Sequence, residues 1–247
     1  YDNHLHPMYW ENTAPRDSFF YVNKWGPEYE VDRAIEFLSK QEKDTSPFAL
    51  VVSMNPPHTG YDLVPDKYKA IYKDLDVESL CKNRPDIPAG GTEMGDYFRN
   101  NLRDYYACIT GVDENIGRLI KELKRLNLFD NTIVVFTSDH GICMGAHNSA
   151  GKDIYYEESM RVPVIISWPQ QLKPRIDNRT MIAFGDMYPT LLSMMGFSED
   201  IPQEVQTFDL SASILSGKDN KKIVQPYYYV QPDNPATGYR GLRTSRY

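Results

Sequence analysis

An aspartate and a histidine stand side by side directly after an apolar run, and this pair could bind a cation. The run at 132–136, Thr-Ile-Val-Val-Phe, is rich in β-branched residues, which is typical of a buried strand. Asp139 and His140 follow where that strand should end, and ligands bind at the carboxyl edge of open α/β sheets. Carboxylate oxygens and imidazole nitrogens are both metal ligands. A polar turn through Ser138 and Gly141 is the alternative interpretation.

Two further residues could join this pair. A second apolar run, at 48–54, ends in a polar segment that contains His58. If both strands are parallel, their downstream ends bring His58 close to Asp139 and His140. Lys152 ends a loop that contains three glycines and little that could build a core, and long loops of this kind are usually functional or disordered. A cation, a histidine and a lysine that lie close together could bind an anion such as a sulfate or phosphate ester.

The elements that would position these residues alternate between helix and strand. Apolar periodicity and capping residues predict helices at 27–38, 65–72, 102–126 and 186–195, and strands at 48–54, 132–137 and 162–167. The longest helix carries apolar residues at steps of three and four, which predicts one apolar stripe: Leu102, Tyr105, Ile109, Val112, Ile116, Leu119, Leu123 and Leu126. This alternation predicts an α/β fold with a largely parallel central sheet. Tyr227–Val230 is a further expected strand without an assigned partner.

Composition limits the class of protein. The 247 residues suffice for one large domain, and 41% hydrophobic and 13% aromatic residues argue against disorder. No apolar run approaches the roughly 18 residues of a membrane span, so we expect no transmembrane segment. A net charge of −7 argues against a nucleic-acid partner and requires that an anionic substrate be held by local positive charge. The three cysteines form no disulfide or zinc pattern.

Three blocks in a fixed order carry a resemblance to a known family. The segments 105–120, 131–141 and 156–166, with Lys152 before the last of them, resemble the type I, formylglycine-dependent sulfatases of the alkaline phosphatase superfamily. The resemblance extends from about Trp25 to the C-terminus. It implies a central sheet flanked by helices that is incomplete at both ends. It further implies that residues 1–225 are the C-terminal part of the catalytic domain and that residues 226–247 begin a smaller C-terminal subdomain.

The resemblance also implies roles for individual residues. Asp139 and His140 match residues that bind a divalent cation, usually Ca²⁺, with Mg²⁺ as the alternative. His58 matches a histidine that contacts the sulfate group and the ester oxygen, and Lys152 matches a lysine with a similar role. His147 falls on a position that is often histidine in relatives, where it either contacts substrate or is a hydrogen-bonded loop residue. The implied catalytic pair is therefore His58 and Lys152.

Other family features are missing from the sequence. The family's nucleophile is a formylglycine made from the cysteine of a Cys-x-Pro/Ala-Ser-Arg motif, and Cys81, Cys108 and Cys143 all lack that context. The upstream pair of aspartates that completes the cation site is absent too. We therefore expect an internal fragment, roughly half of a sulfatase, that is inactive alone and whose nucleophile and signal peptide lie outside it. Family resemblance places the parent protein in the periplasm, the lysosome or the medium.

The implied activity is hydrolysis of a sulfate ester on a sulfated small molecule or glycan, and a sulfated sugar is the expected substrate. A phosphodiesterase or phosphonate hydrolase of the same superfamily is one alternative. A relative that binds sulfated glycans without catalysis is the other. Neither the regiospecificity nor the oligomeric state can be predicted from the sequence.

Overall fold

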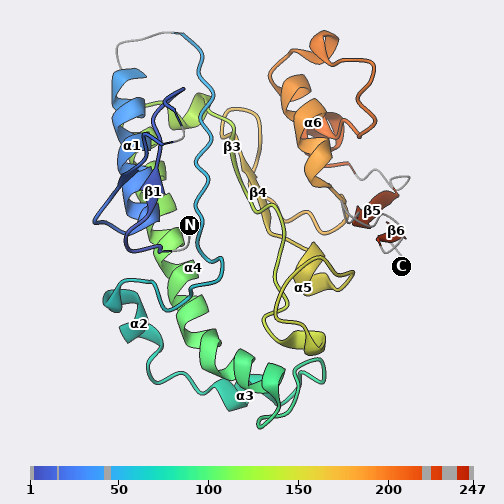
Figure 1. Cartoon of the computed structure of the whole chain (residues 1–247). Coiled ribbons are helices and arrows are strands. Elements are labelled where there is room, and N and C mark those ends of the chain that lie inside the picture. The colour runs from blue at the N-terminus through green and yellow to red at the C-terminus, as the bar shows by residue number, and fades with distance from the viewer. Residues whose placement is uncertain (1–2, 16, 42–45, 219–223, 230–237, 245–247) are drawn as a thin grey trace. The chain divides into compact units, whose positions relative to one another are not determined.

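The computed structural model describes residues 3–15, 17–41, 46–218, 224–229 and 238–244 (Figure 1). Tertiary contacts divide the chain into two units. The first unit comprises Tyr1–Thr132 and Ile142–Gly151, and the second comprises Ile133–Gly141 and Lys152–Tyr247.

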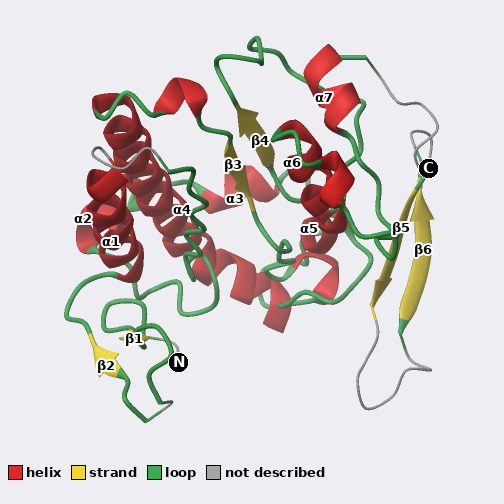
Figure 2. Cartoon of the chain, turned by 90° about the horizontal axis from the view of Figure 1, so that it is seen from above, coloured by secondary structure: helices red, strands yellow, loops and turns green. Residues whose placement is uncertain are grey.

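Two long helices, α1 (Gly26–Gln41) and α4 (Glu93–Arg125), lie side by side in the first unit (Figures 1 and 2). The hydroxyl of Thr92 caps α4 by accepting a hydrogen bond from the Gly95 amide at 3.2 Å. On α1 the buried residues include Val31, Ala34 and Leu38, whose spacing places them on one helix face. The helices predicted at 27–38 and 102–126 are thus confirmed by α1 and α4.

The buried face of α4 differs in part from the predicted stripe. Ile109 is 41% exposed, whereas the small residues Cys108 and Gly111 are buried. Gly111 is needed because a Cβ atom there would overlap the rings of Trp25 and Tyr68, which pack against the helix. The orientation of α4 is therefore set by two aromatic rings from outside the helix, a contact that helical periodicity alone does not reveal.

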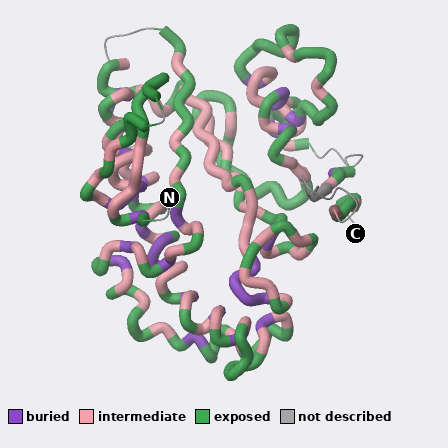
Figure 3. The backbone as a smooth tube through the Cα atoms, in the orientation of Figure 1, coloured by how far each residue is buried: buried purple, intermediate pink, exposed green. Residues whose placement is uncertain are grey.

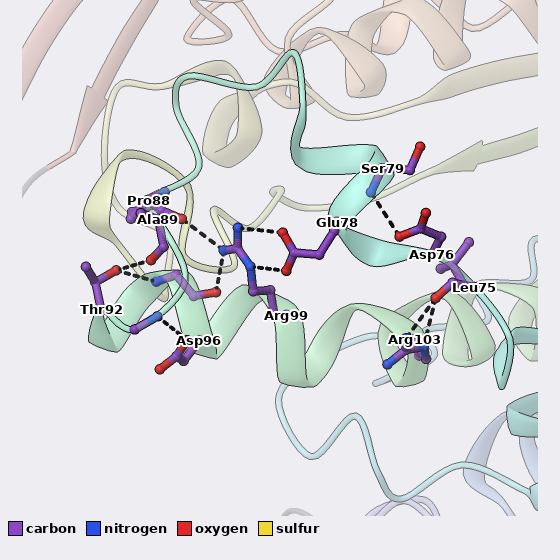
Figure 4. A network of polar contacts seen from close by, with 12 residues as sticks. Leu75, Asp76, Glu78, Ser79, Pro88, Ala89, Thr92, Asp96, Arg99 and Arg103 are labelled. Atoms are coloured by element: carbon purple, nitrogen blue, oxygen red, sulfur yellow. Dashed lines mark hydrogen bonds and ion pairs between the residues drawn. The ribbon is translucent and has the colours of Figure 1, made fainter.

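Two short helices, α2 (Asp66–Tyr72) and α3 (Val77–Cys81), precede α4 in the first unit, and the second of these was not predicted. Arg99 on α4 anchors the segment that connects α3 to α4 (Figure 4). Its guanidinium donates hydrogen bonds to both carboxylate oxygens of Glu78, at 2.6 and 3.2 Å. It also donates to the carbonyls of Pro88 and Gly95, both at 2.9 Å.

The loop at 142–151 packs into the first unit, which corrects the expectation that it could contribute little to a core. Met144 belongs to a buried cluster with Phe98 and Leu102 of α4. Gly145 has a φ of 99° and lies so close to α4 that a Cβ atom would overlap the carbonyl oxygen of Met94. Glycine is required there for both reasons.

The second unit is built on the antiparallel pair β3 (Val134–Thr137) and β4 (Val164–Ser167). Both strands were expected. Ile133 and Ile166 pack against a cluster from α6 (Met187–Met194) and α7 (Ser211–Ser216). These elements give the second unit an apolar core of its own.

An antiparallel hairpin, β5 (Gln225–Tyr229) and β6 (Tyr239–Arg243), follows in the second unit (Figure 2). It supplies the partner for the expected strand at Tyr227–Val230, of which Val230 lies outside the described residues. A short helix, α5 (Glu157–Met160), lies between β3 and β4 in the sequence.

The expected largely parallel sheet is not formed by the described residues. All strand pairs among them are antiparallel, and residues 48–54 form no regular secondary structure and pair with no described strand. Exposed positions recur along this segment (Figure 3), and Val51 is 90% exposed. A strand needs a neighbour for its backbone hydrogen bonds, and the described chain offers none here.

The remaining short elements connect these parts: β1 (Met8–Tyr9), β2 (Phe20–Tyr21), η1 (Phe129–Asn131), η2 (Ala146–Asn148), η3 (Phe184–Asp186) and η4 (Ser198–Asp200). Among the described residues, no helix combines the length and the apolar character that a membrane span requires.

Candidate cation and substrate site

Strand β3 delivers Asp139 and His140 to its downstream end, as the sequence predicts. Local hydrogen bonds fix the chain after the strand. The Ser138 hydroxyl donates to the carbonyl of His140 at 2.9 Å, and the Gly141 amide donates to the carbonyl of Ser159 at 2.8 Å. A Cβ atom on Gly141 would overlap the backbone of the 158–159 segment, so the glycine permits this close approach.

The carboxylate of Asp139 has one oxygen engaged locally and one directed at His140. Its Oδ1 accepts a hydrogen bond from the His140 amide at 2.9 Å and lies 3.3 Å from the Ser138 hydroxyl oxygen. Its Oδ2 lies 3.3 Å from Nε2 of His140. The arrangement leaves Oδ2 and Nε2 as neighbouring donor atoms.

The tautomer of His140 follows from its other nitrogen. Nδ1 lies 2.8 Å from the carbonyl oxygen of Gly141, and a carbonyl can only accept a hydrogen bond. In the neutral ring the proton is therefore on Nδ1, and Nε2 carries the lone pair. This is the arrangement by which proteins orient a metal-binding histidine.

These two residues fit part of a divalent cation site. Their donor atoms are close enough to be adjacent ligands of one ion, since Ca²⁺ takes its ligands at about 2.3–2.6 Å. The Asp139 side chain is 76% exposed and that of His140 is 36% exposed, so an ion can reach both. Six to eight ligands are usual for Ca²⁺, so further ligands must complete the site.

A hollow of about 240 Å³ in the second unit contains this pair. Its lining adds another carboxylate, a serine, two aliphatic residues and three tyrosines: Asp153, Ser159, Ile154, Met160, Tyr155, Tyr227 and Tyr239. Two carboxylates at one opening repel an anion unless a cation offsets their charge. The electrostatics of the hollow therefore favour a cation as its first occupant.

Lys152 belongs to the second unit and immediately precedes Asp153, which lines the hollow. Its side chain is half-buried. No hydrogen bond or ion pair joins it to the residues that the structure describes. Its ammonium group is thus available to an anion.

His58 belongs to the first unit. Its amide donates a hydrogen bond to the carbonyl of Asn55 at 3.0 Å, and its Nδ1 lies 3.0 Å from the Thr59 hydroxyl. The half-buried ring is therefore held from one side by its own turn.

His147 also belongs to the first unit and has a φ of 54°, in the left-handed region that is uncommon for residues other than glycine. Its amide donates to the carbonyl of Asp86 at 2.7 Å. The pKa of the Asp86 carboxyl is lowered, chiefly by hydrogen bonds from Arg84 and to a smaller extent by the charge of His147. This geometry anchors the loop and is compatible with either predicted role.

Of the five predicted site residues, the structure brings Asp139 and His140 together and places Lys152 in the same unit. His58 and His147 lie in the other unit, and their convergence with the pair stays a prediction.

The sequence interpretation missed the lining of the hollow. No tyrosine was predicted as a site residue, yet Tyr155, Tyr227 and Tyr239 line the opening beside Asp139 and His140. A signal was present: Asp153, Ile154 and Tyr155 follow Lys152 directly. The approach of the β5–β6 hairpin depends on tertiary contacts that periodicity does not show.

Residues 19–197 match the sequence model of the Sulfatase family. The chain is 32% identical to an endo-4-O-sulfatase of Bacteroides thetaiotaomicron, covering 100% of this chain and 50% of that protein. It is 34% identical to a ulvan-active sulfatase of Formosa agariphila, covering 97% of this chain and 46% of that protein. The chain thus spans about half the length of these relatives.

A solved structure supports the same assignment. The crystal structure of a Bacteroides fragilis protein described as a sulfatase, YidJ, superposes with a TM-score of 0.96 at 74% identity and covers 99% of this chain and 52% of that one. The fold is thus the alkaline phosphatase-like fold of sulfatases, and the family match covers most of the chain. The chain belongs to the sulfatase family.

Proposed function

We propose that the parent protein, a protein of the relatives' full length that contains this chain, hydrolyses a sulfate ester on a sugar. The observation that carries the proposal is the Asp139–His140 pair, whose donor atoms lie 3.3 Å apart beside a hollow. Two relatives are described as an endo-4-O-sulfatase and a ulvan-active sulfatase, which supports a glycan substrate.

Asp139 Oδ2 and His140 Nε2 would hold the divalent cation, which we propose is Ca²⁺. When bound, the cation supplies positive charge against a sulfate oxygen and so acts as a Lewis acid. Asp139 contributes the negative charge that retains a hard cation, and the Gly141 carbonyl keeps the His140 ring in the binding tautomer.

We assign Lys152 and His58 to the substrate anion. Both residues contact the sulfate group, and His58 or Lys152, bonded to the ester oxygen, stabilises or protonates the departing alkoxide. His147 contacts the substrate or holds the loop. The nucleophile that attacks sulfur, a hydroxyl group of a formylglycine hydrate, would come from the part of the parent outside this chain.

The same proposal covers the wider architecture. The central parallel sheet would be completed by strands outside this chain. Residues 1–225 would be the C-terminal part of the catalytic domain, and 226–247 would begin the smaller subdomain. The parent would work in the periplasm, the lysosome or the medium.

The test is an assay of the full-length parent with a panel of sulfated sugars. Because a positioned acid or charge contributes roughly 10²–10⁴ in rate, His58→Ala and Lys152→Met should each lower kcat by at least about a hundredfold. Asp139→Asn should weaken Ca²⁺ binding by about tenfold or more, measured by restoring activity to the chelated enzyme. The exposed residues Lys173 and Asp200 offer matched controls, Lys173→Met and Asp200→Asn.

Near-normal turnover of the Lys152 variant would refute its role. Hydrolysis of phosphate esters but no sulfate ester would favour the phosphoesterase alternative. Binding of sulfated glycans without any hydrolysis would favour the non-catalytic one.

A further inference from the structure

The hollow that contains Asp139 and His140 has an aromatic side. Tyr155 and Tyr239 line it while remaining 50% and 40% exposed. Their ring centroids are 5.5 Å apart and the ring planes meet at 74°, so the two rings form a corner rather than a flat stack. Large aromatic side chains left exposed beside a functional site are a common mark of ligand binding.

Two contacts hold the aromatic residues at this place. Arg243 on β6 forms an ion pair with Glu157 at the start of α5, with Nη2 donating to Oε2 at 3.3 Å. The pair ties the strand that carries Tyr239 to the segment that carries Tyr155. On the same hairpin, Gly241 lies opposite Tyr227, and a Cβ atom on Gly241 would overlap the Tyr227 ring. The glycine therefore lets that ring lie across β6.

The chemistry of the corner suits a sugar ring. The face of an aromatic ring is electron-rich and attracts the weakly positive C–H groups of a pyranose. Sites for drug-sized ligands have roughly 300–1,000 Å³. The hollow, with about 240 Å³, is therefore matched to a single ring. Under the proposed function a cation would bind at Asp139 and His140, so the sulfate of a bound ester would lie there and its sugar beside the tyrosines that line the same hollow.

We propose that Tyr155 and Tyr239 form the two walls of a subsite that positions the pyranose ring of the substrate, with its sulfate group at Asp139 and His140. The inference rests on the proposed function and deepens it, because it names the residues that recognise the sugar rather than the sulfate. Neither tyrosine takes part in breaking the ester bond; both are positioning residues.

The experiment separates sugar recognition from sulfate recognition in the full-length parent. The substrate is the sulfated monosaccharide that the wild-type parent hydrolyses fastest, and the inhibitors are its desulfated product and inorganic sulfate. Aromatic contacts are worth about 0.5–1.5 kcal/mol each. Tyr155→Ala and Tyr239→Ala should therefore raise KM and the Ki of the desulfated sugar by about three- to tenfold. The Ki of inorganic sulfate and kcat should change by less than about twofold.

The conservative variants Tyr155→Phe and Tyr239→Phe keep the ring and should retain the wild-type Ki for the sugar. The matched control is Tyr188→Ala on α6, a residue that is 51% exposed and lies outside the lining of the hollow.

If the wild-type parent is active and the alanine variants have the wild-type Ki for the desulfated sugar, the proposed subsite is wrong and the proposed function is unaffected. Equal shifts of both Ki values also overturn it, because they assign the tyrosines to the integrity of the site. A wild-type parent that hydrolyses no sulfated sugar overturns the proposed function, and the subsite with it.

Discussion

His140 has its Nδ1 2.8 Å from the Gly141 carbonyl oxygen, so a neutral ring that donates a hydrogen bond there keeps the Nε2 lone pair for a cation next to Asp139. Asp139 is arranged in the same way, because Oδ1 accepts a hydrogen bond from the His140 amide while Oδ2 stays directed at the histidine. Each of the two side chains thus has one atom fixed by its neighbours in sequence. The pair is oriented before an ion binds, which reduces the loss of side-chain conformational entropy on binding.

Glu30 on α1 predicts a pH dependence of stability. Burial raises the pKa of its carboxyl to about 7, although a 2.9 Å hydrogen bond from the Tyr9 hydroxyl to Oε1 opposes the shift. Oε2 is buried without a partner among the described residues. The folded state keeps the Glu30 proton at pH values where the unfolded chain has already lost it, above about 4.5. The contribution of protonated Glu30 to the free energy of unfolding is therefore complete below pH 4.5 and is lost as the pH rises towards 7.

We expect Glu30→Gln to flatten the fall in the free energy of unfolding between pH 5 and 8 and to stabilise the protein at pH 8. A gain on the order of 1–3 kcal/mol is expected from the linkage. Urea unfolding across this pH range is the measurement. Glu36→Gln on the same helix is the control, since Glu36 is 46% exposed. An unchanged pH profile in the Glu30 variant would assign the dependence to another group.

Among the elements, the segment between α3 and α4 depends on Arg99 (Figure 4). Its side chain is only 17% exposed, and it satisfies two backbone carbonyls as well as Glu78. Arg99→Met should lower the free energy of unfolding by about 1–3 kcal/mol, because partly buried acceptors lose their donor. Arg125→Met is the matched control on the same helix. The Arg125 side chain, which forms an ion pair with Glu122, is 57% exposed. Arg125→Met should therefore lower the free energy of unfolding by less than about 0.5 kcal/mol.

The urea midpoint of each variant gives this comparison directly. Equal midpoints for Arg99→Met and Arg125→Met would show that the segment is held by its apolar contacts instead.

The elements also show what the sequence could predict. The α1 and α4 helices and the β3 and β4 strands were predictable, because each carries its own periodicity or β-branched run. The burial of Met144 was not, because it depends on Gly145 approaching α4, and the orientation of α4 depends on Trp25. Asp139 and His140 were found because they follow a strand directly. The tyrosines that line the same hollow were missed because Tyr239 reaches it only through the pairing of β5 with β6.

At the scale of the whole molecule, the segment 48–54 bears on how this chain would fit into a protein of its relatives' full length. Several of its apolar residues are exposed, with Leu50 at 37% and Val51 at 90%, and its backbone is part of no described strand pair. Backbone groups that lack a strand partner can pair with another strand. Since the chain spans about half of its relatives, the partner strand is expected in the remaining half of the parent.

Hydrogen exchange tests this expectation. The amides of 48–54 should exchange rapidly in the 247-residue chain alone and should be protected by about a hundredfold or more in the full-length parent, because there they would be hydrogen-bonded within a sheet. The middle of α4 should be protected in both proteins, and the loop around Ile176, which is 95% exposed, in neither. Rapid exchange of 48–54 in the parent as well would exclude this segment from any sheet. The proposed parallel arrangement, which brings His58 to the edge where Asp139 and His140 lie, would then lose its basis.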